Sequence, residues 1–414
     1  MKVTFALLLF FAISVCSFSQ SKSAYLASNR LDLNTSFTFP QTDFKLLGFG
    51  AIHGSSKTET AEIKLLESLL QNNDIRYYLM EVNYSHGYYF NEFLETGDTI
   101  LLKELIHDYG YRVSQERSIS VYEKWKALYR LNQSLPEAKR LTVIGLEAPY
   151  FYKYAIRQIA ALTAGQYDNW ETLNEIKAAA QLDTTIFYSY KELPIAEVIK
   201  RFVEESEEQS ISWANEKDMQ PLLAHLRLSF KDENREQQIF ENYVALSKFY
   251  DFSTNKQFAR YGFFHLEKYR ERDSYPPFFA RLIDNDIHAK TDVMTVMGYL
   301  TDSKVLWNIK KDRNYDYKGY STKAGYGISD YLLEYFQGIH ELKKAQISDL
   351  TLFRLNQPDS PYHESEPDLI AIKKIIGRSN RKDVAGKATT QFIDYALLIS
   401  DSPANVPLAE LKSD

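Results

Sequence analysis

The sequence has a single cysteine, Cys16, and this residue lies in a segment that we expect to be removed. A mature chain without cysteine has no disulfide, no thiol nucleophile and no cysteine metal ligand. Its stability must therefore come from burying a hydrophobic core. A chain of 414 residues is long enough to build one.

The sequence also lacks a hydrophobic run long enough to span a bilayer, since its apolar stretch at Phe5 to Val15 is too short. A lysine precedes this stretch and small polar residues follow it, which is the layout of a cleaved secretory signal. We expect residues 1–20 to be a signal peptide, and the mature chain to be exported to the periplasm or the outside of the cell. A lipid anchor at Cys16 is the minor alternative, because Val15 stands where a lipoprotein signal prefers a small residue.

No cluster of lysine and arginine suited to nucleic acid occurs, and the formal net charge is −6. A chain of this charge is a poor partner for nucleic acid or an anionic membrane surface. After signal cleavage we expect no integral membrane segment. The expected partner is a small-molecule or peptide substrate.

Several signatures of catalysis and nucleotide binding are missing. The sequence contains no G-x-S-x-G elbow, no H-E-x-x-H helix, no P-loop and no G-x-G-x-x-G fingerprint. The run "HESE" at 363–366 resembles the zinc motif only in its first two residues. These absences argue against a serine triad of the elbow type and against a zincin.

Strand-like and helix-like segments alternate along most of the chain. The apolar runs at 44–51 and 75–82 flank an amphipathic helix at 55–73, which predicts a βαβ unit with a parallel pair of strands. The fold class is therefore predicted to be α/β, with a mostly parallel sheet flanked by helices. Further strands are expected at 141–148, 257–266, 292–300, 304–309, 350–355 and 394–400, and a further helix at 120–135.

Three other segments complete the predicted organisation. Residues 150–250 are helical in character and predict a large helical insertion. Residues 21–40 form an extended lead-in, so that the domain, with its insertion, covers 41–414. Residues 310–327, rich in Lys, Tyr and Gly, have no period and predict a solvated loop, with a lid over a site as the alternative.

Four ionisable residues end apolar runs: His53, Glu81, Glu147 and His265. One such residue alone is usually structural, but the carboxyl ends of parallel strands line one crevice, where ligands bind. Four ionisable groups there would be costly to bury without partners. The two histidines also share a Gly-x-x-His pattern, "GAIH" at 50–53 and "GFFH" at 262–265.

The segments around these residues resemble known proteins. "GAIHGSSKTETAEIKLLESLLQNNDIRYYLMEV", "YRLNQSLPEAKRLTVIGLEA" and "FIDYALLISDSPANVPL" are similar to the erythromycin esterase-like proteins. The wider group includes the TIKI proteases, the TraB-type proteins and the ChaN-type haem-binding proteins. The resemblance covers roughly residues 44 to 408, with the helical insertion matching only in character.

The resemblance implies roles for the strand-end residues. His53 matches the catalytic histidine of these esterases, Glu81 their strand-end glutamate, His265 the histidine of the second motif, and Glu147 an acidic position usually held by Asp. Two positions depart from the pattern. The esterases have Gly-Glu where this chain has "FG" at 49–50, and an arginine of the following helix is replaced by Glu62.

The leading hypothesis is a hydrolase of an ester, lactone or amide. In it His53 acts as a general base on water, Glu81 orients the imidazole, and His265 stabilises charge on the attacked carbonyl. Tyr84 and His86 would hold the substrate at the crevice mouth. No cofactor is expected for this route.

Two alternatives use the same crevice. In the first, His53, Glu81 and His265 ligate a divalent metal, as the resemblance to the TIKI proteases implies for a metal-dependent peptidase. In the second, the crevice binds a haem-like ligand without catalysis.

Overall fold

The computed structural model describes residues 21–182, 194–209, 211–272, 274–313, 316–324, 329–364 and 366–412. The expected signal peptide at 1–20 lies outside the described residues. Over the ranges above, no helix has the length and apolar character needed to cross a membrane.

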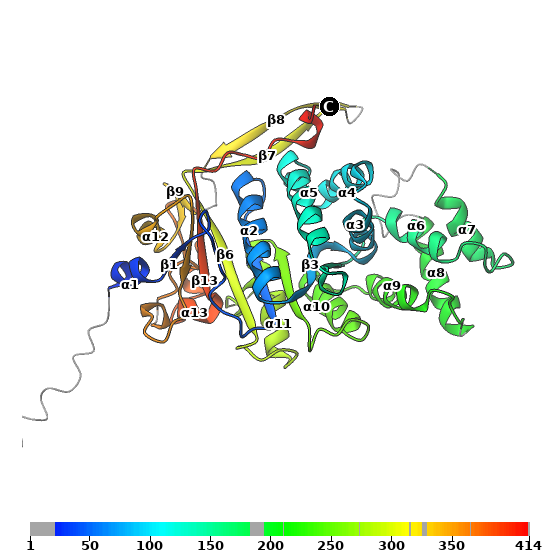
Figure 1. Cartoon of the computed structure of the whole chain (residues 1–414), viewed down its shortest axis with the longest axis horizontal. Coiled ribbons are helices and arrows are strands. Elements are labelled where there is room, and N and C mark those ends of the chain that lie inside the picture. The colour runs from blue at the N-terminus through cyan, green and yellow to red at the C-terminus, as the bar shows by residue number, and fades with distance from the viewer. Residues whose placement is uncertain are drawn as a thin grey trace, which may run out of the picture.

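An eight-stranded sheet forms the centre of the molecule, in the order β1-β11-β13-β6-β2-β5-β3-β4 (Figure 1). Neighbouring strands from β13 to β4 pair in parallel, whereas β11 and β1 are antiparallel to their neighbours. The predicted α/β class with a mostly parallel sheet is confirmed. The strands are β1 (Arg30–Asp32), β2 (Leu46–Gly50), β3 (Ile75–Asn83), β4 (Thr142–Glu147), β5 (Lys256–Tyr261), β6 (Val293–Thr301), β11 (Leu350–Arg354) and β13 (Tyr395–Ser400).

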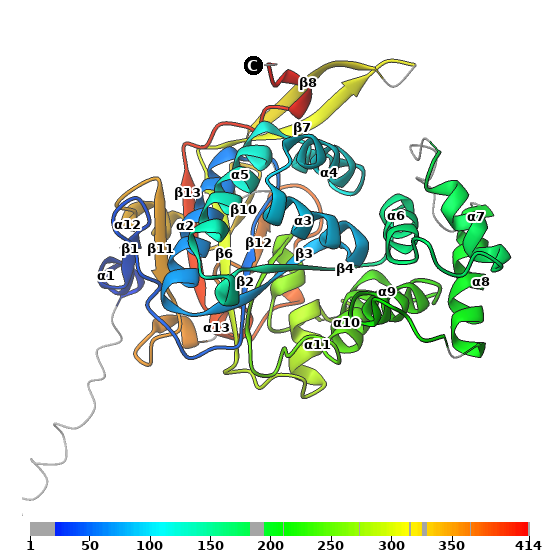
Figure 2. The same ribbon diagram turned by 45° about the vertical axis from the view of Figure 1, so that its right-hand side comes forward.

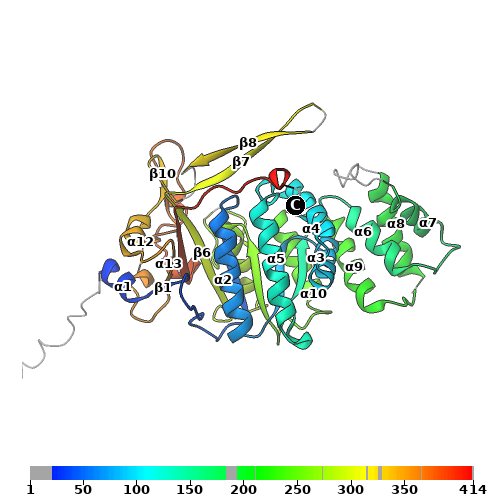
Figure 3. The same cartoon turned by 45° about the horizontal axis from the view of Figure 1, so that its top comes forward.

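Helices cover both faces of this sheet, so the central strands are buried on both sides and read as continuous apolar runs. One face packs against α2 (Ser56–Asn72) and α5 (Ile119–Ser134), and the other against α10 (Arg235–Leu246) and α11 (Phe278–Asp284) (Figures 1 and 3). Helix α2 turns Leu66, Leu69 and Leu70 inward, and all three are buried. Their helical spacing is part of the pattern that predicted the helix, whereas Ile63 of the same pattern is only half-buried.

The predicted βαβ unit is correct in direction but wrong in pairing. Strands β2 and β3 are parallel, yet β5 lies between them and pairs with both. Strand β5 arrives in the chain only after the helical segment, so the local pattern around 44–82 contains no sign of it.

The chain between β4 and β5 is helical in the described residues. Helices α6 to α9 form a lobe at the β4 end of the sheet, and α10 returns against β4 (Figure 2). The helices are α6 (Lys153–Leu162), α7 (Glu171–Ala179), α8 (Pro194–Glu208), α9 (Glu216–Ser229) and α10.

Two segments differ from the predictions. The expected extended lead-in begins with α1 (Lys22–Ser28), whose Tyr25 and Leu26 are buried, and continues into β1. The expected loop at 310–327 belongs largely to a hairpin of β7 (Lys304–Lys311) and β8 (Tyr317–Ala324), although 325–327 lie outside the described residues. Most of this hairpin is exposed on both faces, so it lacks the apolar alternation that marks a half-buried strand.

The remaining elements lie at the sheet's ends and edges. Helices α3 (Tyr84–Thr96) and α4 (Thr99–Arg112) connect β3 to the short helix η1 (Ser114–Glu116), and η4 (Phe263–Leu266) follows β5. Strands β9 (Asp330–Tyr331), β10 (Glu334–Phe336) and β12 (Ile372–Lys374) form a small sheet. The other helices are α12 (Ile339–Ala345), α13 (Thr389–Phe392), η2 (Glu137–Lys139), η5 (Pro361–His363), η6 (Asn380–Lys382) and η7 (Leu408–Glu410).

Gly145 tests how closely β4 approaches the end of β3. A Cβ at Gly145 would lie 2.1 Å from the carbonyl oxygen of Asn83 and 2.5 Å from that of Val82. We expect Gly145→Ala to lower the free energy of unfolding by about 3 kcal/mol or more, because backbone cannot move aside as a side chain can. Gly165→Ala, with open space around a left-handed backbone, should cost only about 1 kcal/mol. Urea unfolding of both variants measures the difference, and equal costs would contradict this view of the β3–β4 contact.

Candidate functional site

The four residues predicted from strand ends meet in one cluster. His53 follows β2, Glu81 lies near the end of β3, Glu147 ends β4, and His265 lies in η4 just after β5. Since these strands are parallel, their carboxyl ends open on the same edge of the sheet. Arg235 joins Glu81, Glu147 and His265, and His53 lies beside Glu81.

His53 lies between two carboxylates. Its Nδ1 is 2.5 Å from Oε1 of Glu116, and its Nε2 is 3.5 Å from Oε2 of Glu81. Burial alone would lower the pKa of His53, but the hydrogen bonds and negative charges of Glu116 and Glu81 outweigh burial and raise the pKa to about 9. The imidazole is therefore protonated at neutral pH, with its side chain 18% exposed.

Glu116 is a site residue that the sequence reasoning missed. It is buried in η1, and although burial raises its pKa, the hydrogen bond and charge of His53 lower it to about 2. It supplies a carboxylate to the histidine where the esterase pattern has one at position 50. Gly50 has no side chain to supply one, and a Cβ added there would lie 2.6 Å from Sδ of Met297. Glu116 stands in an aperiodic turn, and no pattern in the sequence singles it out.

Arg235 is the second residue that the sequence reasoning missed. It is the first residue of α10, whose N-cap Asn234 accepts a hydrogen bond from the backbone of Gln237. Its Nη2 donates to Oε1 of Glu81 at 2.5 Å and to Oε1 of Glu147 at 2.6 Å. The segment was predicted only as part of a helical insertion, so its reach into the crevice could not be anticipated.

His265 is held by Arg235 and Glu236. Its Nε2 accepts a hydrogen bond from Nη1 of Arg235 at 2.9 Å, and its Nδ1 is 2.5 Å from Oε1 of Glu236. Because an arginine can only donate, this pairing places the ring proton of a neutral imidazole on Nδ1. In this arrangement His265 points no N–H towards a substrate and instead orients the guanidinium.

Glu147 anchors two arginines. Its Oε2 accepts from Nη2 of Arg112 at 2.6 Å, and Arg235 contacts both of its oxygens. Glu147 is almost fully buried, so two cations offset the cost of removing its charge from water.

Gly262 explains the first position of the second Gly-x-x-His motif. Its backbone N–H donates to Oε2 of Glu81 at 3.1 Å. A Cβ there would lie 3.4 Å from Cδ2 of His265 and 3.5 Å from Nε2 of His53. The missing side chain therefore leaves space between the two imidazoles.

Tyr84 and His86 do not line the mouth of this site, so that prediction is wrong. The hydroxyl of Tyr84 bonds that of Tyr250 at 2.9 Å, and Nε2 of His86 is 3.0 Å from the carbonyl oxygen of Leu105. His86 also stacks on Tyr154 with ring centroids 4.5 Å apart. Burial lowers its pKa to about 4, so it is a neutral core residue.

A second group of buried charges lies close to Glu116. Lys124 of α5 lies 2.6 Å from Oε2 of Glu59 and 3.0 Å from Oε2 of Glu62, while Arg260 of β5 lies 3.1 Å from that same oxygen of Glu62. We call Glu59, Glu62, Lys124 and Arg260 the buried charge layer. Lys124 and Arg260 both help to lower the pKa of Glu116. Position 62 of α2, where the resemblance predicts an arginine, thus carries a glutamate. This glutamate pairs with two cations from other elements, Lys124 and Arg260.

The residues proposed as metal ligands do not fit a divalent ion as they stand. Arg235 already donates to both Glu81 and His265, and its positive charge would repel a metal held between them. In the described part of the chain, no three or more His, Cys, Asp and Glu side chains are grouped as a metal site. We therefore derive no step through a metal.

Several solved structures superpose on most of this chain, although their sequences are only distantly similar. No protein-family profile and no curated protein matches the chain. Among solved structures, a protein from Bacillus cereus superposes with a TM-score of 0.63 at 10% identity, covering 94% of this chain and 99% of that one. A succinoglycan biosynthesis protein has a TM-score of 0.60 at 13% identity, with 95% and 99% covered.

A third structure is the erythromycin esterase EreC, as a mutant in its open conformation. It has a TM-score of 0.55 at 12% identity and covers 88% of this chain and 93% of that one. The chain shares the fold of erythromycin esterase. At this identity the likeness extends to the fold alone, and the chemistry must be argued from the side chains.

The pKa of His53 makes stability depend on pH. A pKa raised from 6.5 to about 9 stabilises the folded chain fully below pH 6.5, and this contribution disappears as the pH rises through 9. We expect the free energy of unfolding of the native chain to exceed that of His53→Gln by at most about 3 kcal/mol at pH 6, with this excess gone by pH 10. Urea unfolding across that range measures it. An excess that does not change with pH would contradict the ion pairs of His53.

Proposed function

We propose that this chain is a hydrolase of an ester, lactone or amide in which His53 transfers the proton of the attacking water. The observation that carries the proposal is the position of His53 between Glu81 and Glu116, facing His265 across Gly262. The shared fold with an erythromycin esterase supports a hydrolytic reading at the level of architecture.

His53 must lose its own proton before it can act as a base. Because its pKa is about 9 in the resting site, only a minor fraction is neutral at pH 7.5. That fraction is a stronger base than an ordinary histidine, and the imidazolium that forms on attack is stabilised at once by Glu116 and Glu81. The same imidazolium then returns the proton to the leaving group.

Arg235 is the group that stabilises negative charge on the attacked oxygen. Its Nη1 donates one N–H to His265, and within the described ranges the other N–H of that nitrogen has no acceptor, which leaves it for a substrate oxygen. This differs from the role predicted from the sequence, in which His265 itself contacted that oxygen. His265 and Glu147 instead fix the plane of the guanidinium.

The other expectations stay predictions. Metal-dependent peptidase activity and binding of a haem-like ligand gain no specific observation from the side chains. We further propose that the chain is exported after cleavage near residue 20, on the basis of its amino-terminal sequence, and that its partner is a small-molecule or peptide substrate.

The direct test is hydrolysis of a panel of activated esters, lactones and short peptides. We expect His53→Ala to abolish turnover while leaving the chain folded. In the native protein, kcat/KM should rise with pH up to about 9, because deprotonation of His53 creates the base. Glu116→Gln should move this rise to lower pH. Full activity in His53→Ala, or a rate that falls over the same pH range, would contradict the mechanism.

Gly262→Ala separates the chemistry from stability. The backbone at Gly262 has φ −57° and ψ 151°, which alanine adopts freely, and the added methyl meets both imidazoles only at ordinary contact distance. We expect stability to change by less than about 1 kcal/mol. Turnover should nevertheless fall at least about tenfold, because the methyl occupies the space where water must attack. Unchanged turnover would place the reacting atoms elsewhere.

A further inference from the structure

The hairpin of β7 and β8 differs in charge from the rest of the molecule. The chain as a whole has a formal net charge of −6, yet residues 304–324 contain six lysine or arginine residues and two aspartates. In Figures 1 and 3 the two strands extend along the top of the molecule and project beyond it. The cations are Lys304, Lys310, Lys311, Arg313, Lys318 and Lys323.

Most of these cations remain available to a ligand. Lys304, Lys310 and Arg313 are exposed, and no ion pair joins them to any described residue. Lys318 pairs with Asp312 at 3.0 Å in solvent, where such a pair is weak. The hairpin is therefore a concentrated positive surface on an acidic protein.

The hairpin is joined to the candidate site at its base. The backbone N–H of Leu306 donates to the carbonyl oxygen of Gly54 at 2.8 Å, and Gly54 directly follows His53. Strand β7 also packs against η1, which carries Glu116. A ligand bound along β7 can therefore extend to the residues next to His53.

Exposed aromatic side chains lie close in the chain to residues of the candidate site and to the base of the hairpin. Trp307 follows Leu306 and is 46% exposed, with the ammonium of Lys323 4.3 Å from its ring centroid. Phe264 precedes His265 and is 52% exposed, and Tyr150 follows β4 and is 38% exposed. Large aromatic rings that stay partly exposed next to polar site residues are typical of a surface that binds rings rather than of a protein core.

We propose that β7 and β8 form the binding arm for an acidic polysaccharide, whose carboxylate-bearing sugars contact the lysines while sugar rings stack on Trp307 and the aromatic rim. This inference rests on the proposed function, because it names the substrate class of that site. An anionic membrane would also engage the lysines, and exposed aromatic rings can enter its interface, so vesicle binding is one outcome of the test. An acidic glycan is the occupant that we propose, because one extended chain can contact the lysines along the arm and present a sugar to the candidate site at its base.

The test measures binding rather than turnover, using the mature full chain. Affinity electrophoresis in polygalacturonate should retard the native protein, whereas neutral dextran should not. Lys310→Glu combined with Lys318→Glu should weaken polygalacturonate binding at least about tenfold, because two attractive charges become repulsive. The matched control combines Lys200→Glu with Lys248→Glu, two exposed lysines outside the hairpin.

Each other outcome overturns the proposal. Equal weakening by the control variant would show general charge attraction, and no retardation of the native protein would show that the arm does not bind acidic glycans. Binding to phosphatidylglycerol vesicles but not to polygalacturonate would assign the arm to membranes. His53→Ala should bind polygalacturonate normally, so failure of this proposal and failure of the hydrolase proposal are distinguishable.

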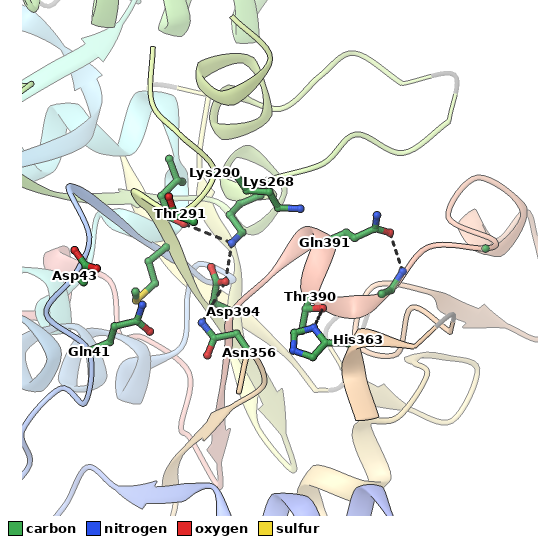
Figure 4. Close-up of a pocket in the computed structure, with 14 residues that line it drawn as sticks. Gln41, Asp43, Lys268, Lys290, Thr291, Asn356, His363, Thr390, Gln391 and Asp394 are labelled. Carbon is green, nitrogen blue, oxygen red and sulfur yellow. Dashed lines mark hydrogen bonds and ion pairs between the residues drawn. The ribbon is translucent and has the colours of Figure 1, made fainter. Parts of the chain in front are cut away.

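A cavity of about 760 Å³ lies away from the candidate site, at the amino-terminal ends of β6 and β13 (Figure 4). Its buried Lys268 is already paired with Asp394 at 2.6 Å, and His363 is bonded to Thr390. The buried charges of Lys268 and Asp394 thus satisfy each other, so this cavity points to no ligand class.

Discussion

The guanidinium of Arg235 is the contact on which the candidate site depends. It contacts Glu81 of β3, Glu147 of β4 and His265 after β5, so one side chain connects three strand ends. Two buried carboxylates side by side would repel each other, and a shared cation reverses the sign of that interaction. Because Arg235 begins α10, the helical segment between β4 and β5 takes part in building the site.

A second set of interactions determines the pKa of His53. The hydrogen bond and charge of His53 are the main reason that the pKa of the buried Glu116 is low, and Lys124 and Arg260 of the buried charge layer lower it further. Glu116 in turn keeps His53 protonated in the resting state. Lys124 of α5 and Arg260 of β5 thus act on the imidazole only indirectly, through Glu116. Lys124 and Glu62 each have two partners in this layer, whereas removal of Glu62 would leave the buried Arg260 without its carboxylate, which is costly.

The sequence predicts the parts of this structure that follow from periodicity. Continuous apolar runs mark the buried parallel strands, and parallel strands bring their carboxyl ends together, so the meeting of His53, Glu81, Glu147 and His265 could be expected. Strand order could not, since β5 inserts between β2 and β3 from far along the chain. His86 was misread because a polar residue near a strand end can equally face the core.

Glu116 and Arg235 show the other limit of sequence reasoning. Each is one charged residue in a segment rich in charged residues, and only the folded chain places it beside a histidine. Gly50 and Glu62 stand where the resemblance implies a glutamate and an arginine, so the sequence lacks both charges at those positions. The structure instead brings a carboxylate and a guanidinium from other elements. The charges of the candidate site are therefore set by the three-dimensional positions of side chains, and the same charge can come from a different strand or helix.

The central claim is that the carboxylates of Glu81 and Glu116 keep the His53 imidazole protonated in the resting site. The most direct measurement is an NMR titration of the His53 ring in the native protein and in Glu116→Gln. A pKa near 9 that falls by at least about one unit in the variant is the result that this account predicts. A pKa near 6.5 in both proteins would contradict it.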